Sequence, residues 1–123
     1  MRALVLDDSR AMRMILGRIL REVGFEVTEA ADGREGLDML THMAVPDLAL
    51  IDWNMPVMDG LTFVKEVRAV EAYSSMTLMM VTTESEQSQI VRALAAGAHE
   101  YVIKPFTSEA IVDKLSLLGL ASV

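Results

Sequence analysis

The feature that most constrains the fold of this chain is a regular alternation of short apolar runs with amphipathic segments. The apolar runs occupy residues 3–6, 48–51, 76–81 and 101–103, and a less regular predicted strand at residues 25–30 has Phe25, Val27 and, less clearly, Thr28 as its apolar or β-forming members. After each run, apolar residues recur at the spacing of one helix face. Strands with almost continuous apolar sequence are typical of a parallel sheet that helices cover on both faces. We therefore predict an α/β fold with five strand–helix units.

Polar residues mark where most of the predicted helices begin. Ser9, Asp32, Asp59 and Thr107 each precede an amphipathic segment, and Gly24 follows the first one. Side chains of this kind accept hydrogen bonds from the free N–H groups of a first helical turn. Buried faces are predicted for Met12, Ile15, Leu16, Ile19, Leu20 and Val23 in the first helix, and for Ile90, Val91 and Leu94 in the fourth, which spans about residues 86–96.

Five such units without a glycine-rich phosphate loop indicate a flavodoxin-like (βα)5 fold. In this doubly wound architecture the five parallel strands have the order 2-1-3-4-5. No linker, repeat or low-complexity segment interrupts the pattern. We therefore predict a single domain over residues 1–123.

Composition excludes several classes of protein. With no cysteine in the chain, disulfides and thiolate metal sites are excluded. A net charge of −7, from 18 acidic and 11 basic residues, disfavours direct binding to nucleic acid or to anionic membranes. The stretch before the Asp7-Asp8 pair is too short for a signal peptide, and no apolar run reaches the roughly 18 residues of a membrane span. We expect a cytoplasmic protein.

Polar residues lie at the ends of four of the five predicted strands. Asp7 and Asp8 end the first strand, Asp52 the third, Thr82 the fourth and Lys104 the fifth. Because the carboxyl ends of parallel strands meet at one edge of an open sheet, where ligands bind, we expect these groups to converge.

This set of groups favours phosphoryl transfer. Neighbouring carboxylates repel one another unless a hard cation lies between them, and oxygen ligands favour Mg²⁺, with Mn²⁺ as an alternative. Asp52 is the expected nucleophile, while Thr82 and Lys104 stabilise the phosphoryl oxygens. We expect Trp53 at the rim of the site. The two histidines, His42 and His99, have no partner at ligand spacing and are expected to be ordinary helix-end or loop residues.

The motifs at the strand ends resemble those of the receiver domain of two-component response regulators. The likeness covers the whole chain, with LDDS at residues 6–9, DWNMPVMDG at 52–60, VT at 81–82 and YVIKPF at 101–106. Within this family, the single-domain length and the DWNMP run are most similar to the chemotaxis members.

The resemblance implies a phosphoacceptor and its metal site. Asp52 is expected to accept a phosphoryl group from a histidine kinase or from a small acyl phosphate. Asp8, Asp52 and the backbone carbonyl of Asn54 are expected to hold Mg²⁺, with Asp7 acting through water. Asn54 and Glu84 occupy the positions that tune self-dephosphorylation in the family.

The resemblance also implies a conformational switch. Lys104 is expected to contact the phosphoryl oxygens, and its bond to Pro105 to be cis, as receivers usually have it. Thr82 and Tyr101 match the switch pair of the family, whose output surface covers about residues 83–114. The partners implied are a histidine kinase, a downstream protein such as the flagellar motor switch or another effector, and in some systems a phosphatase. We expect a monomer that does not turn over a separate substrate.

Three alternatives stay open at this level. A phosphatase of the haloacid dehalogenase type also uses an aspartate nucleophile, but it needs a second aspartate where this chain has Asn54. The chain is also compatible with the receiver of a DNA-binding regulator or hybrid kinase, or with a phosphorelay shuttle. Glu86 and Gln87 stand where chemotaxis members carry lysines, which disfavours the flagellar motor switch, although Lys114 matches a basic position in the last helix.

Overall fold

Strands and helices alternate along the computed structural model, which describes residues 1–121. The strands are β1 (Arg2–Leu6), β2 (Glu26–Ala30), β3 (Leu48–Ile51), β4 (Thr77–Thr82) and β5 (Glu100–Ile103). The helices are α1 (Arg10–Val23), α2 (Gly33–Leu40), α3 (Gly60–Arg68), α4 (Gln87–Ala96) and α5 (Ser108–Leu117), with a short 3₁₀ helix, η1 (Glu71–Tyr73), between α3 and β4.

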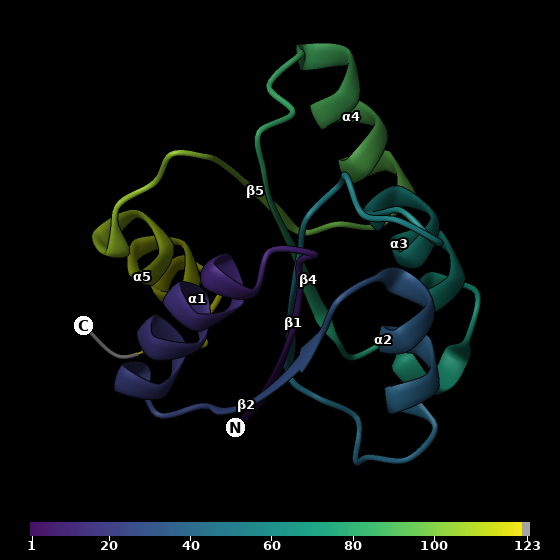
Figure 1. Ribbon diagram of the computed structural model, residues 1–123, viewed down its shortest axis with the longest axis horizontal. Coiled ribbons are helices and arrows are strands. Elements are labelled where there is room, and N and C mark those ends of the chain that lie inside the picture. The colour runs from purple at the N-terminus through teal and green to yellow at the C-terminus, as the bar shows by residue number, and fades with distance from the viewer. Residues whose placement is uncertain (122–123) are drawn as a thin grey trace.

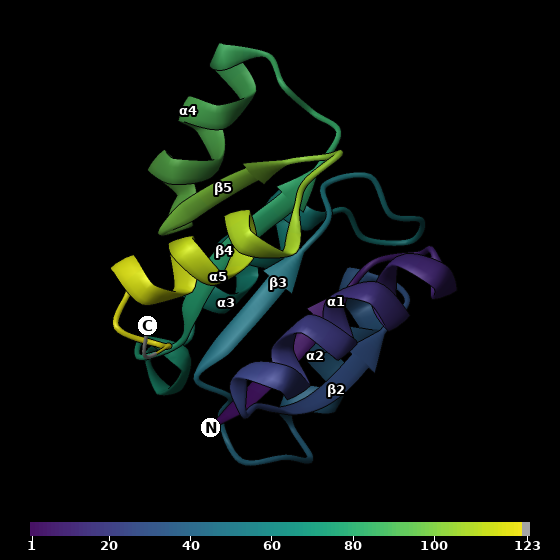
Figure 2. The ribbon, with the colours of Figure 1, turned by 90° about the vertical axis from the view of Figure 1, so that its left-hand side faces the viewer.

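The five strands form one parallel sheet in the order β2-β1-β3-β4-β5, which confirms the predicted flavodoxin-like order. Helices α1 and α5 cover one face of this sheet, and α2, α3 and α4 cover the other (Figures 1 and 2). Strands β1 and β3 lie at the centre, where the winding of the chain changes direction. This switch point is the place at which doubly wound sheets bind ligands.

Two apolar cores lie on the two faces of the sheet, and alternate residues of each central strand enter different cores. In β1, Leu4 and Leu6 pack under α2 and α3, whereas Ala3 and Val5 pack under α1 and α5. Burial on both faces explains why these strands are continuously apolar in sequence.

The predicted capping residues begin their helices as expected. The side chains of Ser9, Asp32, Asp59 and Thr107 each accept a hydrogen bond from a backbone N–H in the first turn of the following helix. Gly24 ends α1 with a φ of 115°, a conformation that favours glycine.

The buried faces of two helices were predicted too broadly. Ile15 is 48% exposed, and on α4 Val91 and Leu94 are 56% and 43% exposed. The fully buried residue of α4 is Ala93, which has the smallest apolar side chain. A helix that contacts the protein through alanine has a narrow buried face, so larger apolar residues on its flanks remain outside. Within residues 1–121, no helix combines the length and the apolar character that crossing a membrane requires.

Candidate functional site

Three carboxylates meet where β1 and β3 end. The hydrogen bonds of the sheet continue to the aspartate that follows each strand and fix its backbone. The Asp52 N–H donates to the Leu6 carbonyl at 2.9 Å, and the Asp7 N–H donates to the Ala30 carbonyl at 3.1 Å. One carboxylate oxygen from each of Asp7, Asp8 and Asp52 lies within 4.8 Å of the others. The predicted acidic cluster is therefore present, with Asp7 and Asp52 buried and Asp8 exposed.

Lys104 neutralises part of this cluster from the end of β5. Its Nζ lies 2.7 Å from an oxygen of Asp7 and 3.5 Å from an oxygen of Asp52. The Lys104–Pro105 peptide bond is cis, as expected. The other oxygen of Asp7 accepts the Ser9 N–H at 2.8 Å, so both Asp7 oxygens have protein partners, and the exposed Asp8 offers the freer ligand atoms.

Burial raises the pKa of Asp52, and the charge of Asp7 adds to this, whereas the Thr82 side chain and the charge of Lys104 lower it. The ionised form of the Asp52 carboxyl is therefore destabilised in this position unless further positive charge lies beside it. The donor atoms of the cluster are carboxylate oxygens only, which fits Mg²⁺ or Mn²⁺ and not zinc or copper.

The predicted switch residues are linked to one another through Glu84. The Tyr101 hydroxyl donates to the Glu84 carbonyl at 2.7 Å, and the Glu84 N–H donates to the Thr82 hydroxyl oxygen at 3.3 Å. The Asn54 amide donates to the Glu84 carboxylate at 3.1 Å, so the two residues expected from the resemblance to tune self-dephosphorylation are in contact. Burial, with the nearby charges of Glu84 and Asp52, raises the pKa of Tyr101 to about 12, which keeps its hydroxyl a donor.

Trp53 is a core residue, and its prediction as a rim residue was wrong. It is only 6% exposed, because its side chain packs into the core under α2, α3 and α4. The guanidinium carbon of Arg92 lies 5.8 Å from the centroid of its ring. No sequence pattern pairs these residues, which are far apart in the chain.

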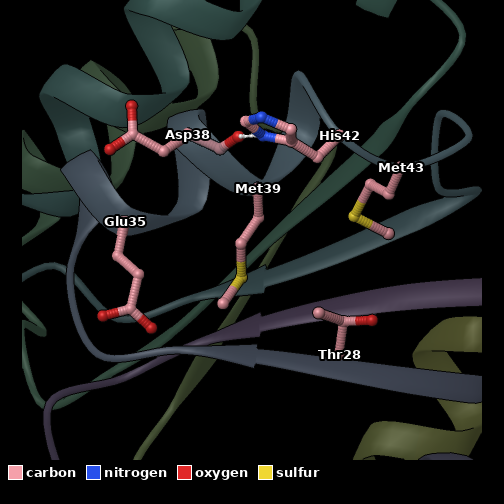
Figure 3. Close-up of a pocket in the computed structure, with 6 residues that line it drawn as sticks. All are labelled: Thr28, Glu35, Asp38, Met39, His42 and Met43. Atoms are coloured by element: carbon pink, nitrogen blue, oxygen red, sulfur yellow. Dashed lines mark hydrogen bonds between the residues drawn. The ribbon is translucent and has the colours of Figure 1, made fainter.

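Neither histidine lies in the cluster. His42 follows α2, and its Nδ1 lies 2.9 Å from the Asp38 carbonyl, as Figure 3 shows. It lines a hollow of about 360 Å³ between α2 and the edge strand β2, with Met39 and Met43 in its wall. This hollow contains none of the three clustered aspartates. His99 lies beside Arg68 and accepts the Leu78 N–H.

Two residues that support the site were not predicted. Arg13 on α1 donates to the Asp7 carbonyl at 2.7 Å and pairs with Glu29 at 3.1 Å, which braces the end of β1. Gly60 begins α3 so close to Asp52 that a side chain there would collide with the Asp52 carbonyl. The sequence pattern predicts only a helix start at Asp59.

Comparison with known proteins agrees with this arrangement. The profile of the response regulator receiver domain matches residues 3–116. A chemotaxis protein CheY homolog of Campylobacter jejuni is 43% identical over 99% of this chain and 95% of its own length. Chemotaxis protein CheY of Pseudomonas aeruginosa is 41% identical over 94% of this chain and 93% of its own. The structure of CheY4 of Vibrio cholerae aligns with a TM-score of 0.87 at 36% identity, covering 94% of this chain and 96% of that one.

The fold and the acidic cluster define a doubly wound α/β protein with its polar site at the switch point of the sheet. The matches over nearly the whole chain then give the family: the protein belongs to the response regulator receiver domains. The likeness to CheY seen in the sequence motifs is confirmed, and the phosphatase alternative is set aside.

Proposed function

We propose that the protein is a phosphorylation-activated signalling protein in which Asp52 accepts a phosphoryl group. The observation that carries this proposal is the position of Asp52, buried at the switch point beside two further carboxylates and 3.5 Å from the Lys104 ammonium. A receiver of this kind modifies itself and does not turn over a separate substrate.

The residues proposed to hold the cation are Asp8, Asp52 and the backbone carbonyl of Asn54, with Asp7 acting through water. A bound Mg²⁺ supplies positive charge that offsets the repulsion among the carboxylates and that of the incoming phosphoryl oxygens. The protein orients the acceptor oxygen, since the backbone N–H of Asp52 is fixed by β1 and Gly60 packs against its carbonyl.

The proposed step is attack of an Asp52 carboxylate oxygen on the phosphorus of a phosphohistidine or of a small acyl phosphate. A bond forms between this oxygen and phosphorus, while the bond from phosphorus to the donor atom breaks. With phosphohistidine, the departing imidazole nitrogen then takes a proton from water. Lys104 can contact the transferred phosphoryl group, because its ammonium already lies between Asp7 and Asp52.

Phosphorylation is proposed to act on Thr82 and Tyr101. Moving a two-state element from 1:99 to 99:1 takes about 5.5 kcal/mol. Hydrogen bonds from Thr82 and Lys104 to the phosphoryl oxygens supply about 3–6 kcal/mol together. A movement of Thr82 would also alter the hydrogen bond of the Tyr101 hydroxyl, because Glu84 links the two residues.

The proposed role is in chemotaxis, since the curated relatives named above are chemotaxis proteins. The phosphodonor would be a histidine kinase, and the output face would include Val91, Leu94 and Ile103, apolar residues that are exposed on α4 and β5. A flagellar motor switch or another effector would bind there, and a phosphatase could act on the same protein.

The test is labelling by acetyl phosphate in the presence of Mg²⁺, followed by measurement of intact mass. The wild-type protein should gain one phosphoryl group, and Asp52→Asn should gain none. Asp32→Asn is the matched control, because asparagine caps a helix as well as aspartate does and Asp32 lies at α2, outside the cluster. Full labelling of Asp52→Asn would show that another residue is the acceptor.

A further inference from the structure

A groove between α3 and α4 differs in charge from the protein as a whole. It has a volume of about 280 Å³ and is lined by Leu61 and Lys65 of α3 and by Arg92, Ala95 and Ala96 of α4. The two helices pack side by side over the sheet (Figure 1). Leu61 and Lys65 are four residues apart, as are Arg92 and Ala96, so each pair lies on one side of its helix and faces the other pair.

The lining of this groove is cationic and apolar. It includes two basic residues and no acidic one, although the chain has 18 acidic and 11 basic residues. Among residues 1–121, neither Lys65 nor Arg92 forms a salt bridge, and the polar contact of the Arg92 guanidinium is with Gln89 at 2.8 Å. Both charges are therefore available to a ligand.

We infer that this groove binds an acidic segment of a partner protein, with an apolar side chain between its carboxylates. The apolar side chain would lie on Leu61 and the two alanines, while the carboxylates would pair with Lys65 and Arg92. The volume is at the lower limit of pockets that hold small molecules, so it suits one or two side chains. Because the net charge of −7 repels an acidic partner at long range, binding requires these local cations.

The groove has a built-in reporter. Arg92 lies 5.8 Å from the ring centroid of Trp53, the single tryptophan of the chain. A carboxylate that draws the guanidinium of Arg92 into the groove weakens this cation–π contact, and the fluorescence of Trp53 should respond.

The experiment is a titration of the full chain, in low salt and without phosphodonor, with a short synthetic peptide of alternating glutamate and leucine. We expect a saturable change in Trp53 fluorescence and NMR shifts at the amides of Leu61, Lys65 and Ala96. Lys65→Glu should weaken binding at least tenfold. A peptide with lysine in place of glutamate should not bind.

The matched control is Arg18→Glu, which makes the same charge change at an exposed position of α1, on the opposite face of the sheet. This variant should weaken binding less than twofold. Equal effects of the two substitutions would show that the peptide responds to net charge alone, and absence of saturation would show that the groove takes no acidic segment. Either result overturns the inference, and neither depends on phosphorylation of Asp52.

Discussion

At the scale of single residues, Val57 has the backbone conformation least expected from its side chain. Its φ is 68°, in the left-handed region that β-branched residues avoid, and its side chain is 82% exposed. The Met58 N–H bonds to the Pro56 carbonyl at 2.7 Å, so Val57 is the central residue of a γ-turn. Met58 in turn accepts the Gly33 N–H at 3.1 Å, which fixes the loop after Asp52 to the start of α2.

We predict that Val57→Gly stabilises the protein. Glycine adopts positive φ without steric cost, while the loss of an exposed side chain removes little packing. After the extra entropy of an unfolded glycine is subtracted, we expect a gain of about 0.5–1 kcal/mol in the free energy of unfolding, measured by urea denaturation. Val70→Gly is the control, because Val70 is also exposed but has an ordinary φ of −105°, and it should destabilise. Equal effects would mean that Val57 carries no strain.

At the scale of elements, Arg68 joins α3 to the residue before β4 and to the α4–β5 loop. From the last turn of α3, its guanidinium donates to the carbonyls of Gly97 at 3.0 Å and Met76 at 2.7 Å. His99 lies 3.2 Å from the same guanidinium and accepts the Leu78 N–H through Nδ1 at 3.1 Å. The Nδ1 nitrogen of His99 must therefore be unprotonated to accept this hydrogen bond, which links β4 to the α4–β5 loop.

This contact predicts a pH-dependent stability. Burial and the charge of Arg68 lower the pKa of His99, so the folded protein binds this proton less tightly than the unfolded chain. Its contribution to stability is complete above the ordinary pKa of about 6.5 and is lost as pH falls through the lowered value. His99→Asn keeps an acceptor oxygen but does not titrate. Between about pH 7.5 and pH 5, the wild-type protein should lose more unfolding free energy than this variant; parallel losses would contradict the assignment.

At the scale of the whole molecule, the acidic cluster and the charge of −7 both oppose the folded state in the absence of cations. Asp7 and Asp52 are buried, and one ammonium group, that of Lys104, offsets them among the residues described. The cluster therefore lowers the stability of the folded protein, and a cation bound beside it would offset this cost.

We predict that Mg²⁺ stabilises the protein by binding at this cluster. A ligand that binds only the folded state at 100 times its Kd adds about 2.7 kcal/mol to the free energy of unfolding. Thermal denaturation with and without Mg²⁺ measures this effect. Asp8→Ala should remove most of it, whereas Asp113→Ala, which deletes an acidic residue of α5 outside the cluster, should keep it. Equal stabilisation of both variants would point to general charge screening.

Most of the fold and the positions of the site residues could be predicted from the sequence, because local rules set them. Capping side chains begin four helices, and apolar runs give the strands. The rule that carboxyl ends of parallel strands meet at one edge brings Asp7, Asp52 and Lys104 together from distant parts of the chain. None of these steps requires knowledge of how tightly a helix packs.

Only the tertiary structure decided which flanking side chains are buried and which distant residues pair. Trp53 lies in the core instead of at the rim, while Leu94 is exposed although its spacing suggested burial. The contacts of Arg92 with Trp53 and of Arg68 with His99 depend on the distance and tilt at which α3 and α4 pack on the sheet. Helical periodicity gives the direction of a side chain about its own axis, but the distance and tilt between helices come from the packing of the whole core.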